Sequence, residues 1–119
     1  MTTPRFHHER VTEHLLREIS WTIANKIRDP RIPKVVTITE IKLSSDTRNA
    51  TVFVSTYGEE QEKREAVAAL NRASAFIQTI VSKRVPIRHF PKLCFRADDS
   101  IDRGMRIDEL LSQVKDDLV

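Results

Sequence analysis

The chain has 119 residues, of which 39% are hydrophobic and 31% charged, and its formal net charge is +3. This length and balance predict one globular domain with a single modest core. No apolar run approaches the roughly 20 residues that a membrane span needs, and the first residues do not resemble a signal peptide. A single cysteine excludes an intrachain disulfide and a multi-cysteine zinc site, and it favours a reducing, cytoplasmic location.

Charge is distributed unevenly along the chain. Residues 1–97 carry 17 Lys or Arg against 10 Asp or Glu, a net charge of +7, whereas residues 98–119 carry 3 against 7, a net charge of −4. A basic body followed by an acidic tail indicates a polyanionic partner for the body. The alternative is an ordinary solvated surface with a charged tail.

The first predicted element is a helix from Pro4 to Arg28, which ends where Pro30 disfavours the helical conformation of Asp29. Its hydrophobic residues recur at helical spacing and form a core stripe of Val11, Leu15, Leu16, Ile19, Ile23 and Ile27. The far side carries a mostly basic row of Arg10, His14, Arg17, Trp21 and Arg28.

Two strands are predicted next, at residues 34–45 and 50–57, because both segments are rich in β-branched residues. The alternation of the first changes phase between Ile38 and Ile41, which predicts a bulge near Glu40. The second places Ala50, Val52 and Val54 on one face, opposite Phe53 and Tyr57. The polar turn between the strands predicts an antiparallel hairpin.

A second helical region is predicted over residues 59–85, with acidic residues at its start and Pro86 after its end. Its buried stripe comprises Ala66, Val67, Leu70, Ala73, Ile77, Ile80 and Val81, and no phase break interrupts it. A third strand, Lys92–Asp98, and an amphipathic tail from Ser100 follow. Three strands with helices packed on one face make a small two-layer α+β domain.

Residue patterns for catalysis or metal binding are weak. Two glycines cannot build a phosphate loop, and mid-strand Cys94 is interpreted as a buried or half-buried structural thiol. Adjacent His7 and His8 point about 100° apart on a helix and are interpreted as solvated. The chain has one carboxylate cluster, which comprises Asp98, Asp99 and Asp102. It either holds a divalent ion or, in the favoured interpretation, caps the tail helix or solvates the strand end. We therefore predict no enzyme activity, metal or cofactor.

The whole pattern resembles the ribosome-binding factor A family of bacterial small-subunit assembly factors. The similarity covers about residues 5–111 and is carried by "RDPRI", "VTITEIKLSSDTRNATVFVS", "LNRASAFIQ" and "FPKLCFRADDSIDRGMRIDELL". The resemblance implies a single type II KH-like domain over residues 1–97, in the order α-β-β-α-kink-α-β. Residues 98–119 would form an acidic, partly helical or flexible tail.

The same resemblance implies a helix kink at Ala73, Ser74 and Ala75, where the family has an Ala-x-Gly sequence in place of the Gly-x-x-Gly loop of ordinary KH domains. Ala75 stands at the glycine position. Because alanine favours helix by about 1 kcal/mol over glycine, we predict a smaller bend than a glycine would allow.

The resemblance further implies a non-enzymatic factor that binds the small (30S) ribosomal subunit and its rRNA. It would assist late maturation of 16S rRNA, including 5′-end processing, and support growth in the cold. Clustered basic residues off the core stripes are the predicted phosphate contacts: Arg10, Arg17, Arg28, Arg72, Lys83, Arg84, Arg88 and Lys92. We expect a cytoplasmic monomer, with other assembly factors as further partners and no membrane contact.

Two alternatives remain open at this stage. In the first, the chain is a protein-interaction module that docks onto another assembly factor through Trp21 and the C-terminal tail. Trp21 lies off the core stripe, where packing is favoured over base stacking. In the second, the chain is a metal-dependent nuclease that uses the Asp98, Asp99 and Asp102 cluster.

Overall fold

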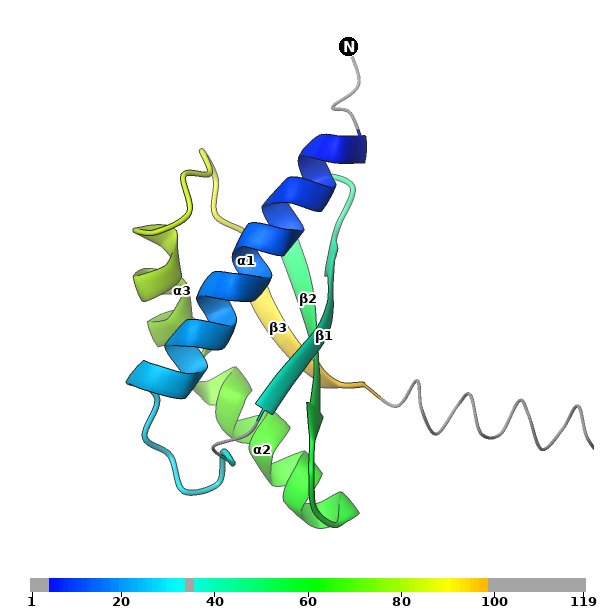
Figure 1. Cartoon of the computed structure of the whole chain (residues 1–119), viewed down its shortest axis with the longest axis vertical. Coiled ribbons are helices and arrows are strands. Elements are labelled where there is room, and N and C mark those ends of the chain that lie inside the picture. Colours follow the sequence, from blue (N-terminus) through cyan, green and yellow to red (C-terminus); the bar gives the residue numbers. More distant parts are fainter. Residues whose placement is uncertain (1–4, 34–35, 99–119) are drawn as a thin grey trace, which may run out of the picture.

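The computed structural model describes residues 5–33 and 36–98. The elements follow the order α1 (Arg5–Lys26), β1 (Val36–Leu43), β2 (Asn49–Thr56), α2 (Glu60–Arg72), α3 (Ser74–Ser82) and β3 (Lys92–Ala97). The helices lie on one side of the three-stranded sheet (Figure 1). The predicted α+β class, its order of elements and its two layers are confirmed.

The sheet has the order β1-β2-β3, with β2 in the centre. β1 and β2 are antiparallel, and their register shifts between Ile38 and Glu40, where the bulge was predicted. β3 runs parallel to β2, because α2 and α3 carry the chain back to the starting end of the sheet. The central strand is therefore the one strand with a neighbour on both sides.

The core lies between this sheet and the helices. It is formed by the predicted α1 stripe and by alternate strand residues, with Leu15, Ile19, Val52 and Phe95 all at most 1% exposed. Val11, Leu16 and Ile27 pack at its margin. The apolar side chains that recur about every 3.6 residues in α1 thus pack against those that recur every second residue in the strands.

α1 ends at Lys26, two residues earlier than predicted. Pro30 explains the difference, because a proline ring clashes with the carbonyl group four residues before it, here that of Lys26. β3 is one residue shorter than predicted and ends at Ala97. Asp98 follows the strand and donates its backbone N–H to the Val54 carbonyl. The tail from residue 99 onward, with its predicted helix, lies outside the described residues.

The second helical region is broken into α2 and α3 at Ala73, in the segment where the kink was predicted. Ala73 has φ −86° and ψ 0°, and its N–H still donates to the Ala69 carbonyl. In the described residues, positive φ values occur at Thr47 and Gly58 and not in this segment. The break therefore needs no glycine, and Ala75 lies within the first turn of α3.

We expect Ala75→Gly to destabilise the protein by up to about 1 kcal/mol, because glycine loses more backbone entropy in a helix than alanine does. Urea denaturation monitored by circular dichroism would measure the change. An unchanged or higher midpoint would mean that Ala75 is strained where it stands. Ala68→Gly, in the exposed middle of α2, is the matched control and should cost about as much.

Candidate nucleic-acid interface

All eight predicted phosphate contacts are exposed. Arg84 forms an ion pair with a carboxylate within 4.0 Å, and the other seven form none with a described residue. The others are Arg10, Arg17 and Arg28 on or just after α1, Arg72 at the end of α2, Lys83 and Arg88 after α3, and Lys92 at the start of β3. Exposed cations without an ion-pair partner are suited to bind phosphate.

α1 packs beside α3, and Arg84 marks the place where they meet. Its Nε donates to Oε2 of Glu18 at 2.5 Å, and its guanidinium group lies 4.2 Å from the centre of the Trp21 ring. Lys26 lies 5.6 Å from the same ring. Trp21 is 38% exposed, and its ring is in contact with Arg84.

This cluster holds Arg84 in a fixed orientation. The bond to Glu18 uses Nε, so the two terminal nitrogen atoms of the guanidinium group have no described acceptor. A planar guanidinium group that stacks on an indole and keeps two NH₂ groups for a phosphate loses little conformational entropy on binding. Among the predicted contacts, Arg84 is therefore the one whose guanidinium group is oriented by described neighbours on two sides.

Arg72 lies close to the segment that follows α1. There Arg31 donates to both carboxylate oxygens of Asp29, at 3.0 Å from Nε and 2.9 Å from Nη2. These hydrogen bonds lower the pKa of Asp29, and the charge of Arg72 acts in the same direction. The "RDPRI" segment and the helix break are thus neighbours, which places Arg28 and Arg72 at one end of the helical layer.

We use the name helical basic surface for the seven predicted phosphate contacts that lie on the helices or in the segments that follow them: Arg10, Arg17, Arg28, Arg72, Lys83, Arg84 and Arg88. Lys92 is different, because it begins β3 and pairs in register with Asn49 of β2. Its side chain is exposed on the sheet face opposite the one where its neighbour Leu93 is buried. The structure thus separates Lys92 from the other seven residues.

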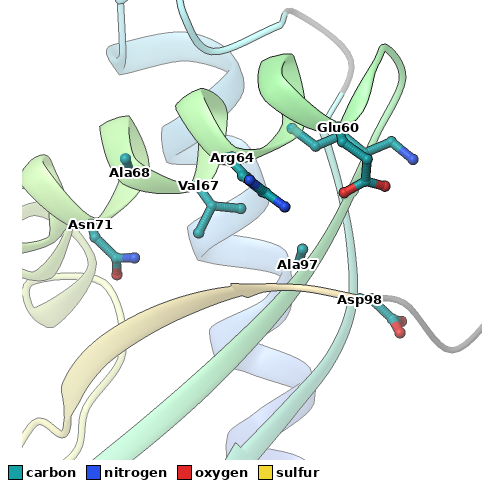
Figure 2. Close-up of a pocket in the computed structure, with 8 residues that line it drawn as sticks. Glu60, Arg64, Val67, Ala68, Asn71, Ala97 and Asp98 are labelled. Carbon is teal, nitrogen blue, oxygen red and sulfur yellow. The ribbon is translucent and has the colours of Figure 1, made fainter.

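A groove of about 380 Å³ runs between α2 and the free edge of β3. Figure 2 shows Arg64, Val67 and Asn71 extending from α2 toward β3, with Ala97 and Asp98 on the opposite side. The lining combines apolar side chains with both signs of charge, since Glu60 and Lys63 also contribute. Sequence patterns did not reveal this groove, because its two walls are about 30 residues apart along the chain.

Asn71 closes part of this edge. Its Nδ2 donates to the Phe95 carbonyl at 3.0 Å, and its Oδ1 accepts from the Phe95 N–H at 2.8 Å. The backbone N–H groups of Lys92 and Asp98 donate toward β2, which indicates that the even-numbered residues of this segment direct their backbone groups to that strand. Phe95 therefore directs its N–H and carbonyl away from β2, to the free edge of the sheet. Asn71 acts in place of a fourth strand there, a role that the sequence pattern did not reveal.

We expect Asn71→Ala to destabilise the fold by about 1–3 kcal/mol, because it leaves the Phe95 N–H and carbonyl without partners at a partly buried edge. Urea denaturation would measure the loss. Gln61→Ala on the same helix is the control, since its amide bonds to an exposed Glu65 and should matter little. Equal stability of the two variants would contradict this role of Asn71.

Two predictions about reactive groups have different outcomes. Cys94 is exposed, so its expected burial is wrong: its side chain lies on the outward face of β3 between buried Leu93 and Phe95. Asp99 and Asp102 lie outside the described residues, and among the described ones no three His, Cys, Asp or Glu side chains form a metal-binding group. No helix in the described part of the chain is long and apolar enough to cross a membrane.

Comparison with known proteins assigns these features to a family. A family model described as Ribosome-binding factor A matches residues 7–111. The ribosome-binding factor A of Clostridium botulinum (strain Alaska E43 / Type E3) is 42% identical over 114 residues, which cover 95% of this chain and 98% of that protein. That of Halothermothrix orenii is 41% identical over 108 residues, covering 91% and 88% respectively.

Solved structures agree with this result. The crystal structure of ribosome-binding factor A from Thermus thermophilus is similar with a TM-score of 0.65 at 28% identity, over 75% of this chain and 93% of that one. A solution structure from Thermotoga maritima, described as a putative ribosome binding factor A, gives 0.60 at 30% identity, over 81% and 91%. A Thermus thermophilus homology model fitted into the cryo-EM map of a 30S complex gives 0.57 at 27% identity, over 77% and 91%.

Proposed function

The chain belongs to the ribosome-binding factor A family, and from this premise we propose that it binds the small ribosomal subunit through the helical basic surface. The observation that carries the proposal is the set of exposed cations on that surface, of which Arg84 alone has a described carboxylate partner. A related protein's model has been fitted into a 30S complex, which supports the same partner here.

The bound groups would be rRNA phosphates. Each Lys or Arg that neutralises a phosphate releases condensed counterions, so several such contacts give an affinity that depends steeply on salt. Arg84 would contribute a guanidinium group already oriented by Trp21 and Glu18. Arg28 and Arg72 would add charge at the end of the helical layer, beside the helix break.

The consequence for the subunit would be assistance in late maturation of 16S rRNA, including processing of its 5′ end. A protein that binds one RNA arrangement better than another shifts the population toward it, and no catalytic group is needed. Misfolded RNA arrangements persist longer in the cold, so such a factor would matter most there. We propose that it acts as a cytoplasmic monomer, in contact with other assembly factors on the subunit.

Sedimentation with purified small subunits tests this proposal. Binding should weaken as salt rises, with a slope of log affinity against log salt of about −0.7 to −0.9 for each phosphate contacted. Ribonuclease treatment of the complex should release the protein. Association that ignores salt and survives removal of the RNA would favour the alternative, a module that docks onto another protein through Trp21 and the tail.

A further inference from the structure

The second face of the sheet is left open by the elements that the structure describes (Figure 1). Its central strand presents Thr51 and Phe53, which are partly exposed, while Ala50, Val52 and Val54 of the same strand are buried on the helix side. β3 presents Lys92, Cys94 and Arg96, all exposed. We call this surface the open sheet face.

Phe53 lies near the middle of the open sheet face. It pairs in register with Glu40 of β1 on one side and with Arg96 of β3 on the other. The ammonium group of Lys42 lies 5.6 Å from the centre of its ring. A charged side chain reaches the ring from the solvent side, so the ring is accessible to a solvated group.

This face carries charges of both signs. Three cations, Lys42, Lys92 and Arg96, surround the part near Cys94. Two acidic groups lie beside this set. Glu40 pairs with Phe53 on the side opposite Arg96, and Asp98 follows β3 and accepts a hydrogen bond from the Thr39 hydroxyl. None of the three cations forms an ion pair within 4.0 Å with a described carboxylate.

From this arrangement we propose that the open sheet face binds a single strand of RNA. One base would stack on Phe53, and the adjoining phosphates would contact Lys42, Lys92 and Arg96. An aromatic side chain on a solvent-facing sheet, flanked by cations, has the chemistry that holds unpaired bases, whereas a duplex keeps its base faces stacked and out of reach. This inference rests on the proposed function and adds a second RNA surface on the other side of the sheet.

Lys42 does not block this role. A cation over an exposed ring is held weakly, and a base stacked on an aromatic side chain is held more strongly. An arriving base would displace the Lys42 ammonium group from Phe53, and the long side chain would then reach a neighbouring phosphate. With the helical basic surface engaged on folded rRNA, the open sheet face would hold an unpaired segment of the immature transcript.

The probe for this proposal is a fluorescent oligouridylate of about ten nucleotides, within the range of lengths that such surfaces accommodate. We expect the full-length chain to bind it, and Phe53→Leu to weaken binding by about tenfold through loss of stacking. Arg96→Glu should also weaken binding and reduce its salt dependence. Thermal melts would check that each variant is folded.

Two matched controls come from the same chain. Phe76→Leu removes an aromatic ring that is 51% exposed on α3, on the helix side of the sheet. Arg64→Glu makes the same charge change on α2. Both should bind the oligouridylate as the unaltered chain does. Equal weakening by Phe53→Leu and Phe76→Leu, or no binding by the unaltered chain, would overturn the proposal.

Cys94 gives a second measurement that requires no variant. It is the only cysteine of the chain and lies on the open sheet face, so bound oligouridylate should slow its alkylation by a maleimide. Unchanged alkylation at saturating oligouridylate would overturn the proposal. So would a thiol that is protected in the free protein and becomes reactive at high salt, because the chain's own acidic tail would then occupy the face.

The two levels of inference fail separately. If the unaltered chain sediments with small subunits while Phe53→Leu binds oligouridylate normally, the single-strand surface is overturned and the proposed function stands. If the unaltered chain does not bind small subunits under any salt condition, the proposed function fails, whatever the oligouridylate result.

Discussion

The double variant Arg72→Glu, Lys83→Glu is expected to bind the small subunit about a hundredfold more weakly than the unaltered chain at low salt. Both residues are exposed, and neither has a described carboxylate within 4.0 Å. Each substitution replaces an attraction to phosphate by a repulsion, a combined change of about 1.4 kcal/mol at a solvated and salt-screened surface, which is about tenfold for each residue. The slope of log affinity against log salt should also become shallower, by about 0.9 for each phosphate that is no longer neutralised.

Sedimentation with purified subunits over a salt series would measure both effects. A double variant with the same change in net charge, Arg48→Glu with Arg64→Glu, controls for nonspecific charge, because these arginines lie in the hairpin turn and on α2. Equal reductions in affinity in the two double variants would indicate that overall charge, and not the helical basic surface, governs binding. Unchanged binding by Arg72→Glu, Lys83→Glu would contradict the interface directly.

Phe95→Ala is expected to destabilise the fold by about 3–5 kcal/mol, the typical cost of truncating a buried aromatic side chain. Phe95 is 1% exposed and lies in β3 between the central strand and the helices. Since small domains are usually stable by only about 5–15 kcal/mol, this one change should remove a large part of the total. Urea denaturation monitored by circular dichroism would measure the loss of stability.

The neighbouring residue supplies the control for this prediction. Cys94 is exposed on the opposite face of the same strand, so Cys94→Ala should change the unfolding free energy by no more than about 0.5 kcal/mol. A comparable destabilisation in both variants would mean that the strand, and not the core packing of Phe95, sets the stability. A destabilisation below about 1 kcal/mol in Phe95→Ala would show that the core refills the cavity.

Much of the fold was predictable because its signals are local. The stripe from Val11 to Ile27 fixes the buried side of α1, and the change of phase between Ile38 and Ile41 fixes the bulge. The helix break was different, because the stripe of residues 66–81 continues through Ala73 without interruption. Family resemblance, and not periodicity, placed the break there.

The site was predictable residue by residue but not as a surface. Exposure of the eight cations follows from their positions off the core stripes. Their grouping does not, because Arg84 meets Trp21 and Glu18 across more than 60 residues of chain, and Lys92 belongs to another face of the domain. Asn71 caps the edge of β3 through a partner 24 residues away, which no local pattern indicates.

Alternation alone also misplaced Cys94. The pattern showed that Lys92, Cys94 and Arg96 share one face of β3, and it could not show whether anything covers that face. Because the helices pack on the Leu93 and Phe95 side, the thiol is exposed.

The sequence by itself determined the elements, their buried sides and the surplus of positive charge, because propensity, periodicity and net charge depend on residues close together in the chain. Only the tertiary structure decided which sheet face the described helices leave uncovered, how Arg84 is held, and that α2 and β3 border a groove closed in part by Asn71. These features are contacts between distant segments. They depend on which apolar faces pack together, and no local pattern encodes that choice.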